Sequence, residues 1–136
     1  MSRNAAVRVL VVEDTRHDPE VTLTALHEQA DDIKVAVVND GNAARRFLAD
    51  CETPPNVILL GMQLPDMEGI ELLRHIRSND RTKSLPVLML IEPEDRTQKN
   101  RTFGLGVNGY IPHVGDAALL ADHLTIFRHL FAGPSC

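Results

Sequence analysis

Apolar residues form five short runs along the chain, at residues 7–12, 35–38, 57–60, 87–91 and 110–111. Within each run they are almost continuous and do not alternate with polar residues. This pattern is typical of strands that are covered on both faces of a sheet. We therefore expect five largely buried strands.

Helix-like stretches separate these runs, because apolar residues recur there at intervals of three and four positions. The clearest stretches are residues 18–30, 68–78 and 116–131, and Asp116 is of a type that commonly caps a helix N-terminus. Their apolar stripes contain Val21, Ala25, Leu26 and Ala30, then Ile70, Leu73 and Ile76, then Leu120, Leu124, Phe127 and Phe131.

The stretch at residues 92–106 has the weakest helical pattern. Residues 92–101 are almost entirely polar, and only Phe103 and Leu105 offer an apolar anchor. We expect a marginal or mobile fourth helix here, and a frayed chain end over residues 132–136.

Alternation of strands and helices predicts an α/β fold. Each strand-helix repeat takes about two dozen residues, which suits right-handed crossovers and a parallel sheet with helices on both faces. In such sheets the functional crevice lies beyond the carboxyl ends of the strands. Glu13, Asp14 and Gly61 follow or end strands at that edge.

Length and composition narrow the class of protein. The chain has 136 residues, of which 43% are hydrophobic and 24% charged, so we expect one globular domain over residues 1–136. A net charge of −5 argues against nucleic-acid binding, and no apolar stretch is long enough for a membrane span. Cys51 and Cys136 show no pairing motif, which favours a reducing, cytoplasmic location.

Acidic residues gather just after the expected strands, which predicts an acidic rim along one edge of the sheet. They are Glu13, Asp14, Asp18 and Glu20, then Asp66 and Glu68, then Glu92, Glu94 and Asp95. The chain contains none of the signature motifs of common serine hydrolases, zinc proteases or Walker-type nucleotide sites. The acidic residues after the first strand would repel a phosphate group, which disfavours a flavin site at that position. We therefore do not expect an enzyme.

Three segments resemble the receiver domains of two-component response regulators, and the resemblance covers roughly residues 7–131. They are Val-Leu-Val-Val-Glu-Asp at 9–14, Leu-Pro-Asp-Met-Glu-Gly at 64–69 and Val-Asn-Gly-Tyr-Ile at 107–111. The resemblance implies a flavodoxin-like fold with five parallel strands in the order 2-1-3-4-5 and five helices.

The resemblance also implies a phosphorylation site with four kinds of group, of which this chain keeps one. Glu13 and Asp14 match the acid pair that holds magnesium. Gly61 stands where the phosphoacceptor aspartate belongs, Ile91 where a threonine or serine belongs, and His113 where a lysine belongs. We therefore expect a degenerate site that accepts no phosphoryl group.

Each of these positions has a purely structural alternative. Gly61 also suits a close backbone approach, and Ile91 suits a β-branched core residue at the end of a strand. His113 also suits an ordinary loop histidine, a pH-sensitive donor or a weak metal ligand. Tyr110 matches the family's aromatic switch position, yet it also suits packing with a polar tip.

No cofactor is expected to be required. Magnesium, if bound, would be held weakly by Glu13, Asp14 and the backbone carbonyl of Gln63. Two rival hypotheses remain at this point. One is a receiver phosphorylated at another acid such as Asp14, and the other is a small metal-binding protein that uses Glu13, Asp14 and His113 or His17.

The predicted function is a stand-alone receiver-like module that works by binding a protein without being phosphorylated. Its partner would be a histidine kinase, a downstream effector or a second copy of the chain. The resemblance implies contacts through helix 4, strand 5 and helix 5. That surface would include Arg96, Lys99, Arg101, Tyr110 and the outer side of residues 116–131.

Overall fold

A single five-stranded sheet lies at the centre of the computed structural model, which describes residues 6–92, 97–102 and 104–132. All strand pairs are parallel, and the strand order is β2-β1-β3-β4-β5. The predicted flavodoxin-like α/β fold is therefore confirmed. The strands are β1 (Val7–Val12), β2 (Ile33–Val38), β3 (Val57–Gly61), β4 (Val87–Ile91) and β5 (Gly109–Pro112).

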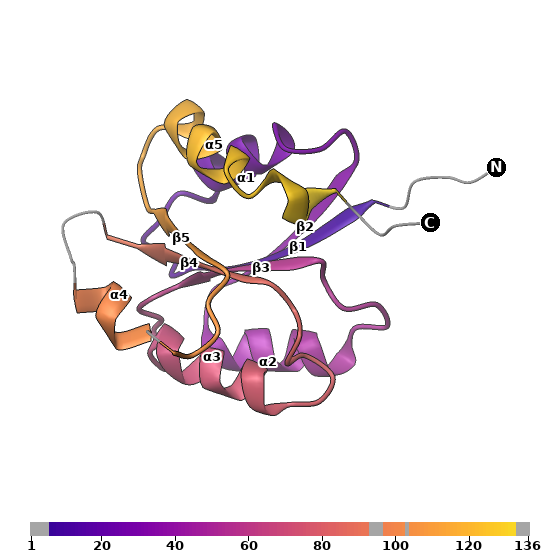
Figure 1. The fold of residues 1–136 in the computed structure, drawn as a ribbon, viewed down its shortest axis with the longest axis vertical. Coiled ribbons are helices and arrows are strands. Elements are labelled where there is room, and N and C mark those ends of the chain that lie inside the picture. Colours follow the sequence, from indigo (N-terminus) through magenta and orange to yellow (C-terminus); the bar gives the residue numbers. More distant parts are fainter. Residues whose placement is uncertain (1–5, 93–96, 103, 133–136) are drawn as a thin grey trace.

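Helices cover both faces of the sheet and make three layers (Figure 1). Helices α1 (Pro19–His27) and α5 (Ala117–Thr125) lie on one face, and α2 (Gly41–Asp50) and α3 (Gly69–Ser78) lie on the other. The short helix α4 (Thr97–Thr102) lies at one side of the molecule, and a 3₁₀ helix (Arg128–Phe131) follows α5.

The alternation of side chains along β1 divides the core between the two faces. Val9 and Val11 pack in the cluster beneath α1 and α5, whereas Leu10 and Val12 pack in the cluster above α2 and α3. Burying each such side chain contributes roughly 1.5–3 kcal/mol. The continuous apolar run is therefore explained by its two covered faces.

Element ends differ from those predicted by the sequence pattern. Helix α1 begins after Asp18, whose carboxylate accepts from the backbone N–H of Glu20, and it ends at His27 instead of residue 30. The fifth helix begins after Asp116, which caps it as expected, but it ends at Thr125 and a separate 3₁₀ turn completes the predicted stretch.

Some predictions fall outside the residues that the structure describes. These are the rim acids Glu94 and Asp95, the interface residue Arg96, the anchor Phe103, the cysteine Cys136 and the frayed segment at 133–136. Within the described ranges, no helix has both the length and the apolar character needed to cross a bilayer.

Candidate functional site

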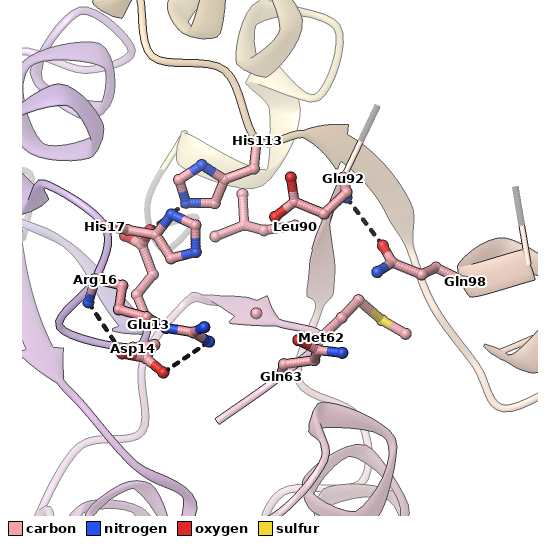
Figure 2. Close-up of a pocket in the computed structure, with 11 residues that line it drawn as sticks. Glu13, Asp14, Arg16, His17, Met62, Gln63, Leu90, Glu92, Gln98 and His113 are labelled. Atoms are coloured by element: carbon pink, nitrogen blue, oxygen red, sulfur yellow. Dashed lines mark hydrogen bonds and ion pairs between the residues drawn. The ribbon is translucent and has the colours of Figure 1, made fainter. Parts of the chain in front are cut away.

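A pocket of about 310 Å³ opens at the carboxyl edge of the sheet, where the loops after β1, β3, β4 and β5 converge (Figure 2). Residues from all four of these loops or strand ends contribute to its wall. The lining residues are Glu13, Asp14, Arg16, His17, Gly61, Met62, Gln63, Leu90, Glu92, Gln98 and His113. This is the edge at which open α/β sheets bind ligands.

Glu13 is the most deeply buried acid of the pocket, with 3% of its surface exposed. Its Oε1 accepts a hydrogen bond of 3.0 Å from the hydroxyl of Thr22 on α1. Its Oε2 lies 2.5 Å from Nε2 of His113, which comes from the loop after β5. Both oxygens of the carboxylate therefore have a partner within the protein.

His113 is tied to the site by this contact and is not an ordinary loop histidine. Its hydrogen bond to Glu13 raises the pKa of the imidazole above 6.5; burial opposes this, and the negative charges of Glu13 and Glu92 add to it. The side chains of His113 and Glu13 are only 14% and 4% exposed. A protonated His113 thus neutralises the buried acid.

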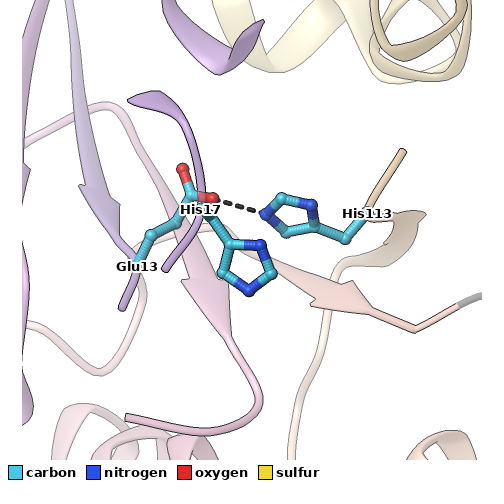
Figure 3. A group of neighbouring side chains, drawn as sticks. All are labelled: Glu13, His17 and His113. Carbon is cyan, nitrogen blue, oxygen red and sulfur yellow. Dashed lines mark hydrogen bonds and ion pairs between the residues drawn. The ribbon is translucent and has the colours of Figure 1, made fainter. Parts of the chain in front are cut away.

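His17 completes a group of three side chains around this ion pair (Figure 3). Its ring lies against the ring of His113, with 3.9 Å between the ring centroids and an interplanar angle of 33°. The backbone N–H of His17 donates to the carbonyl of Asp14, which holds the loop after β1 in a turn. One ligand atom from each of Glu13, His17 and His113 lies within 4.8 Å of the other two.

Asp14 has a different environment from its neighbour. Its carboxylate accepts from the backbone N–H of Arg16 at 2.9 Å and pairs with the guanidinium of the same residue at 3.0 Å (Figure 2). These contacts, the backbone hydrogen bond foremost, lower the pKa of Asp14 below its usual 3.8. The two adjacent acids therefore do not converge on one point as free ligands.

Gly61 ends β3 at the wall of the pocket. A Cβ at this position would lie 3.3 Å from the carbonyl oxygen of Val12 and 3.9 Å from Cδ2 of Leu64. The contact with the backbone oxygen is tight, so a Cβ here would require the Val12 carbonyl to shift by a few tenths of an ångström. The close-approach alternative is therefore compatible with Gly61, and an even closer approach occurs at Gly69, where a Cβ would overlap the carbonyl oxygen of Gly61.

Ile91 and Tyr110 lie close to the pocket but do not line it. Ile91 is buried in the cluster above α2 and α3, as the structural alternative for this residue requires. The hydroxyl of Tyr110 lies 2.5 Å from Oγ1 of Thr102, and Nζ of Lys99 lies 5.6 Å from the centre of its ring. Tyr110 therefore connects β5 with α4.

The rim acids serve several different purposes. Glu13, Asp14 and Glu92 line the pocket, whereas Asp18 caps α1. Asp66 accepts hydrogen bonds from the backbone N–H groups of Gly41 and Asn42 at the start of α2, at 2.7 and 2.9 Å. Glu68 pairs with Arg101 of α4 at 2.8 Å. Much of the predicted rim is thus engaged within the protein.

These contacts do not suit the predicted magnesium site. Magnesium prefers six oxygen ligands in nearly ideal octahedral geometry. Here Glu13 is engaged by the imidazole of His113, Asp14 is paired with Arg16, and Gly61 supplies no carboxylate. The exposed side chain of Gln63 lines the pocket. The ligand-bearing residues that converge are instead Glu13, His17 and His113.

Sequence reasoning missed three residues that shape the pocket. Arg16 neutralises Asp14, and Thr22 holds Glu13. Gln98 is buried, and its Oε1 accepts from the backbone N–H of Glu92 at 2.9 Å. Only Thr22 gave a signal, as a polar residue beside the apolar stripe of the first helix.

Comparison with known proteins gives a consistent result. The family model of the response regulator receiver domain matches residues 9–125. The response regulator Rcp1 of Synechocystis sp. is 31% identical over 108 residues, which are 76% of this chain and 74% of Rcp1. The transcriptional regulatory protein PhoP of Escherichia coli is 34% identical over 108 residues, yet these span only 44% of PhoP.

Solved structures show the same likeness. The crystal structure of the phosphorylated cyanobacterial phytochrome response regulator RcpA superposes with a TM-score of 0.82 at 26% sequence identity. That superposition covers 96% of this chain and 100% of RcpA. The similarity therefore extends over nearly the whole fold.

Proposed function

Since the chain belongs to the response regulator receiver domain family, we propose that it acts in two-component signalling as a protein-binding module that is not phosphorylated at the usual position. Receiver domains are signalling modules. The proposal adds that this one, with its core at residues 7–131, transmits its signal through a surface without phosphoryl transfer. The unpaired pattern of its cysteines supports a cytoplasmic setting.

The observation that carries the proposal is the pairing of Glu13 with His113 beside Gly61. Phosphoryl transfer requires an acceptor carboxylate, and Gly61 has no side chain with which to supply one. It also requires positive charge that is free to stabilise the transferred group. Nε2 of His113 already lies 2.5 Å from a carboxylate oxygen of Glu13, so this side chain is not free to contact a transferred group. Both observations support a site that does not carry out phosphoryl transfer.

Asp14 is a poor substitute as the acceptor. Its carboxylate is held by the N–H and the guanidinium of Arg16, and its lowered pKa reflects a stabilised, less nucleophilic anion. A side chain fixed in this way must lose these contacts before it can attack a phosphodonor. These contacts disfavour phosphorylation at Asp14.

A surface around α4, β5 and α5 supports protein binding. Tyr110 is half-buried there, and Lys99 and Arg101 project from α4 as exposed cations. On α5, Leu119 is 46% exposed and Ile126, just after the helix, is 71% exposed. Exposed aliphatic groups on α5 and exposed cations on α4 suit binding to a histidine kinase, a downstream effector or a second copy of the chain.

The test is treatment of the purified protein with acetyl phosphate and magnesium, followed by intact-mass measurement. We expect no added phosphoryl group on the natural chain. The matched control is the triple variant Gly61→Asp, Ile91→Thr and His113→Lys, which restores all three missing groups and should become modified. A stable adduct on the natural chain would overturn the proposal, and mapping it to Asp14 would establish the rival acceptor.

A further inference from the structure

The three converging side chains at the pocket offer one carboxylate oxygen and two imidazole nitrogens. Imidazole suits zinc, nickel, copper and iron, whereas magnesium and calcium prefer oxygen ligands. The donor set of Glu13, His17 and His113 therefore selects a different class of ion from the one implied by the acid pair. Figure 3 shows the ring of His113 facing the carboxylate of Glu13, with the ring of His17 beside them.

The spacing of these donors requires little adjustment. Zinc binds nitrogen and oxygen at about 2.0–2.2 Å, which places tetrahedral ligand atoms roughly 3.3–3.5 Å apart. The donor atoms here span separations from 2.5 Å, between Glu13 and His113, to at most 4.8 Å. An ion would separate the closest pair by about 1 Å and draw the third side chain inward.

Hydrogen bonds from neighbouring groups hold the proposed ligand residues in place, as is usual for metal ligands. Thr22 donates to the oxygen of Glu13 that does not face His113, and so it fixes the orientation of the carboxylate. The turn in which His17 bonds to the carbonyl of Asp14 fixes the loop after β1. The pocket of about 310 Å³ leaves space for water at a fourth position.

We infer that Glu13, His17 and His113 form a three-residue site for a divalent transition-metal ion, with zinc as the best match. The ion would take the place of the direct contact between Glu13 and His113. It would also join the loop after β1 to the loop after β5. This inference is independent of the proposed function, since a receiver that escapes phosphorylation need not bind any ion.

The experiment is a calorimetric titration of the metal-free, tag-free full chain with zinc, with magnesium as the comparison ion. Cobalt(II) serves as a second probe, because nitrogen ligation in a tetrahedral site gives a strong visible absorption band. The test variant is His17→Gln, which removes one nitrogen donor and keeps both members of the Glu13–His113 pair. The chain has six histidines, so His129→Gln, at an exposed position, is the matched control.

We expect one zinc ion per chain, with magnesium at least about a hundredfold weaker. Removing a residue that only hydrogen-bonds to a metal ligand typically weakens metal binding about 10–100-fold. His17→Gln removes a ligand itself, so it should weaken zinc binding by tenfold or more. His129→Gln should leave the affinity and the cobalt band unchanged. Equal binding by the His17→Gln variant, the absence of a cobalt band or a preference for magnesium would each overturn the inference.

Discussion

The pair formed by His113 and Glu13 makes a testable contribution to stability. The perturbation is His113→Gln, which keeps a hydrogen-bond donor of similar reach but removes the positive charge. Removing one partner of a fully buried pair costs about 3–5 kcal/mol. The His113 side chain is 14% exposed at an open pocket, so we reduce this to about 2 kcal/mol. At this chain length the melting temperature should fall by about 8 °C.

The coupling between the two residues is measured with a double-mutant cycle. The variants are His113→Gln, Glu13→Gln and the two combined, unfolded with urea in the presence of a chelator. We expect the double variant to be more stable than the sum of the single losses predicts, by about 1–2 kcal/mol. A coupling below about 0.5 kcal/mol would show that the short contact does not stabilise the protein.

The pH dependence of this coupling has a definite sign. The folded pKa of His113 is raised above its ordinary 6.5, so the folded state binds the proton more tightly than the unfolded state. The stabilisation is therefore complete below about pH 6.5 and is lost as the pH rises through the folded pKa. A coupling that grows from neutral to alkaline pH would contradict the assignment of the charge to His113.

Three further predictions concern other contacts. Gly61→Asp alone should strengthen magnesium binding, measured by calorimetry, more than it restores modification by acetyl phosphate; full, long-lived phosphorylation would contradict this. The double variant Lys99→Ala, Arg101→Ala should weaken the complex with the protein partner or second copy, measured by light scattering or pull-down. It should change the free energy of unfolding by less than about 1 kcal/mol, because the ion pair between Arg101 and Glu68 is half-exposed. An unchanged complex would place the interface elsewhere. Asp66→Ala should cost about 0.5–1.5 kcal/mol in urea unfolding, because the first two N–H groups of α2 lose their acceptor; a neutral effect would show that these two hydrogen bonds are dispensable.

The strands were predictable because a strand that is covered on both faces has a nearly continuous run of apolar residues in the sequence. Val7–Val12 and Val87–Ile91 have the predicted bounds. Helix ends were less predictable, since the apolar stripe continues past the point where the helix stops. Phe131 is buried like a residue of α5, yet it belongs to the following 3₁₀ turn. The second helix, Gly41–Asp50, was expected from the fold but was not located, although Ala44, Phe47 and Leu48 recur there at helical spacing.

The candidate site was only partly predictable. The acid pair and Gly61 could be identified from local sequence, because each lies directly at the end of a strand. The contact between Glu13 and His113 joins residues 100 positions apart, and loop conformation decides it. Asp14 and Glu13 have different partners because Arg16 pairs with Asp14. The sequence places Arg16 two residues after Asp14, but it does not specify the direction in which the Arg16 side chain points.

The turn after β3 keeps its shape without any side chain at position 61. The N–H of Gly69 donates to the carbonyl of Met62 at 2.7 Å, and the N–H of Leu64 donates to that of Met67 at 3.1 Å. Codons for glycine and aspartate can differ by a single base. One point mutation at Gly61 would therefore add a carboxylate to this turn, with the Val12 carbonyl shifting by a few tenths of an ångström to make room for the new Cβ. Acquiring an acid here is thus a short genetic step for this gene, whereas rebuilding the contacts of His113 would require further mutations.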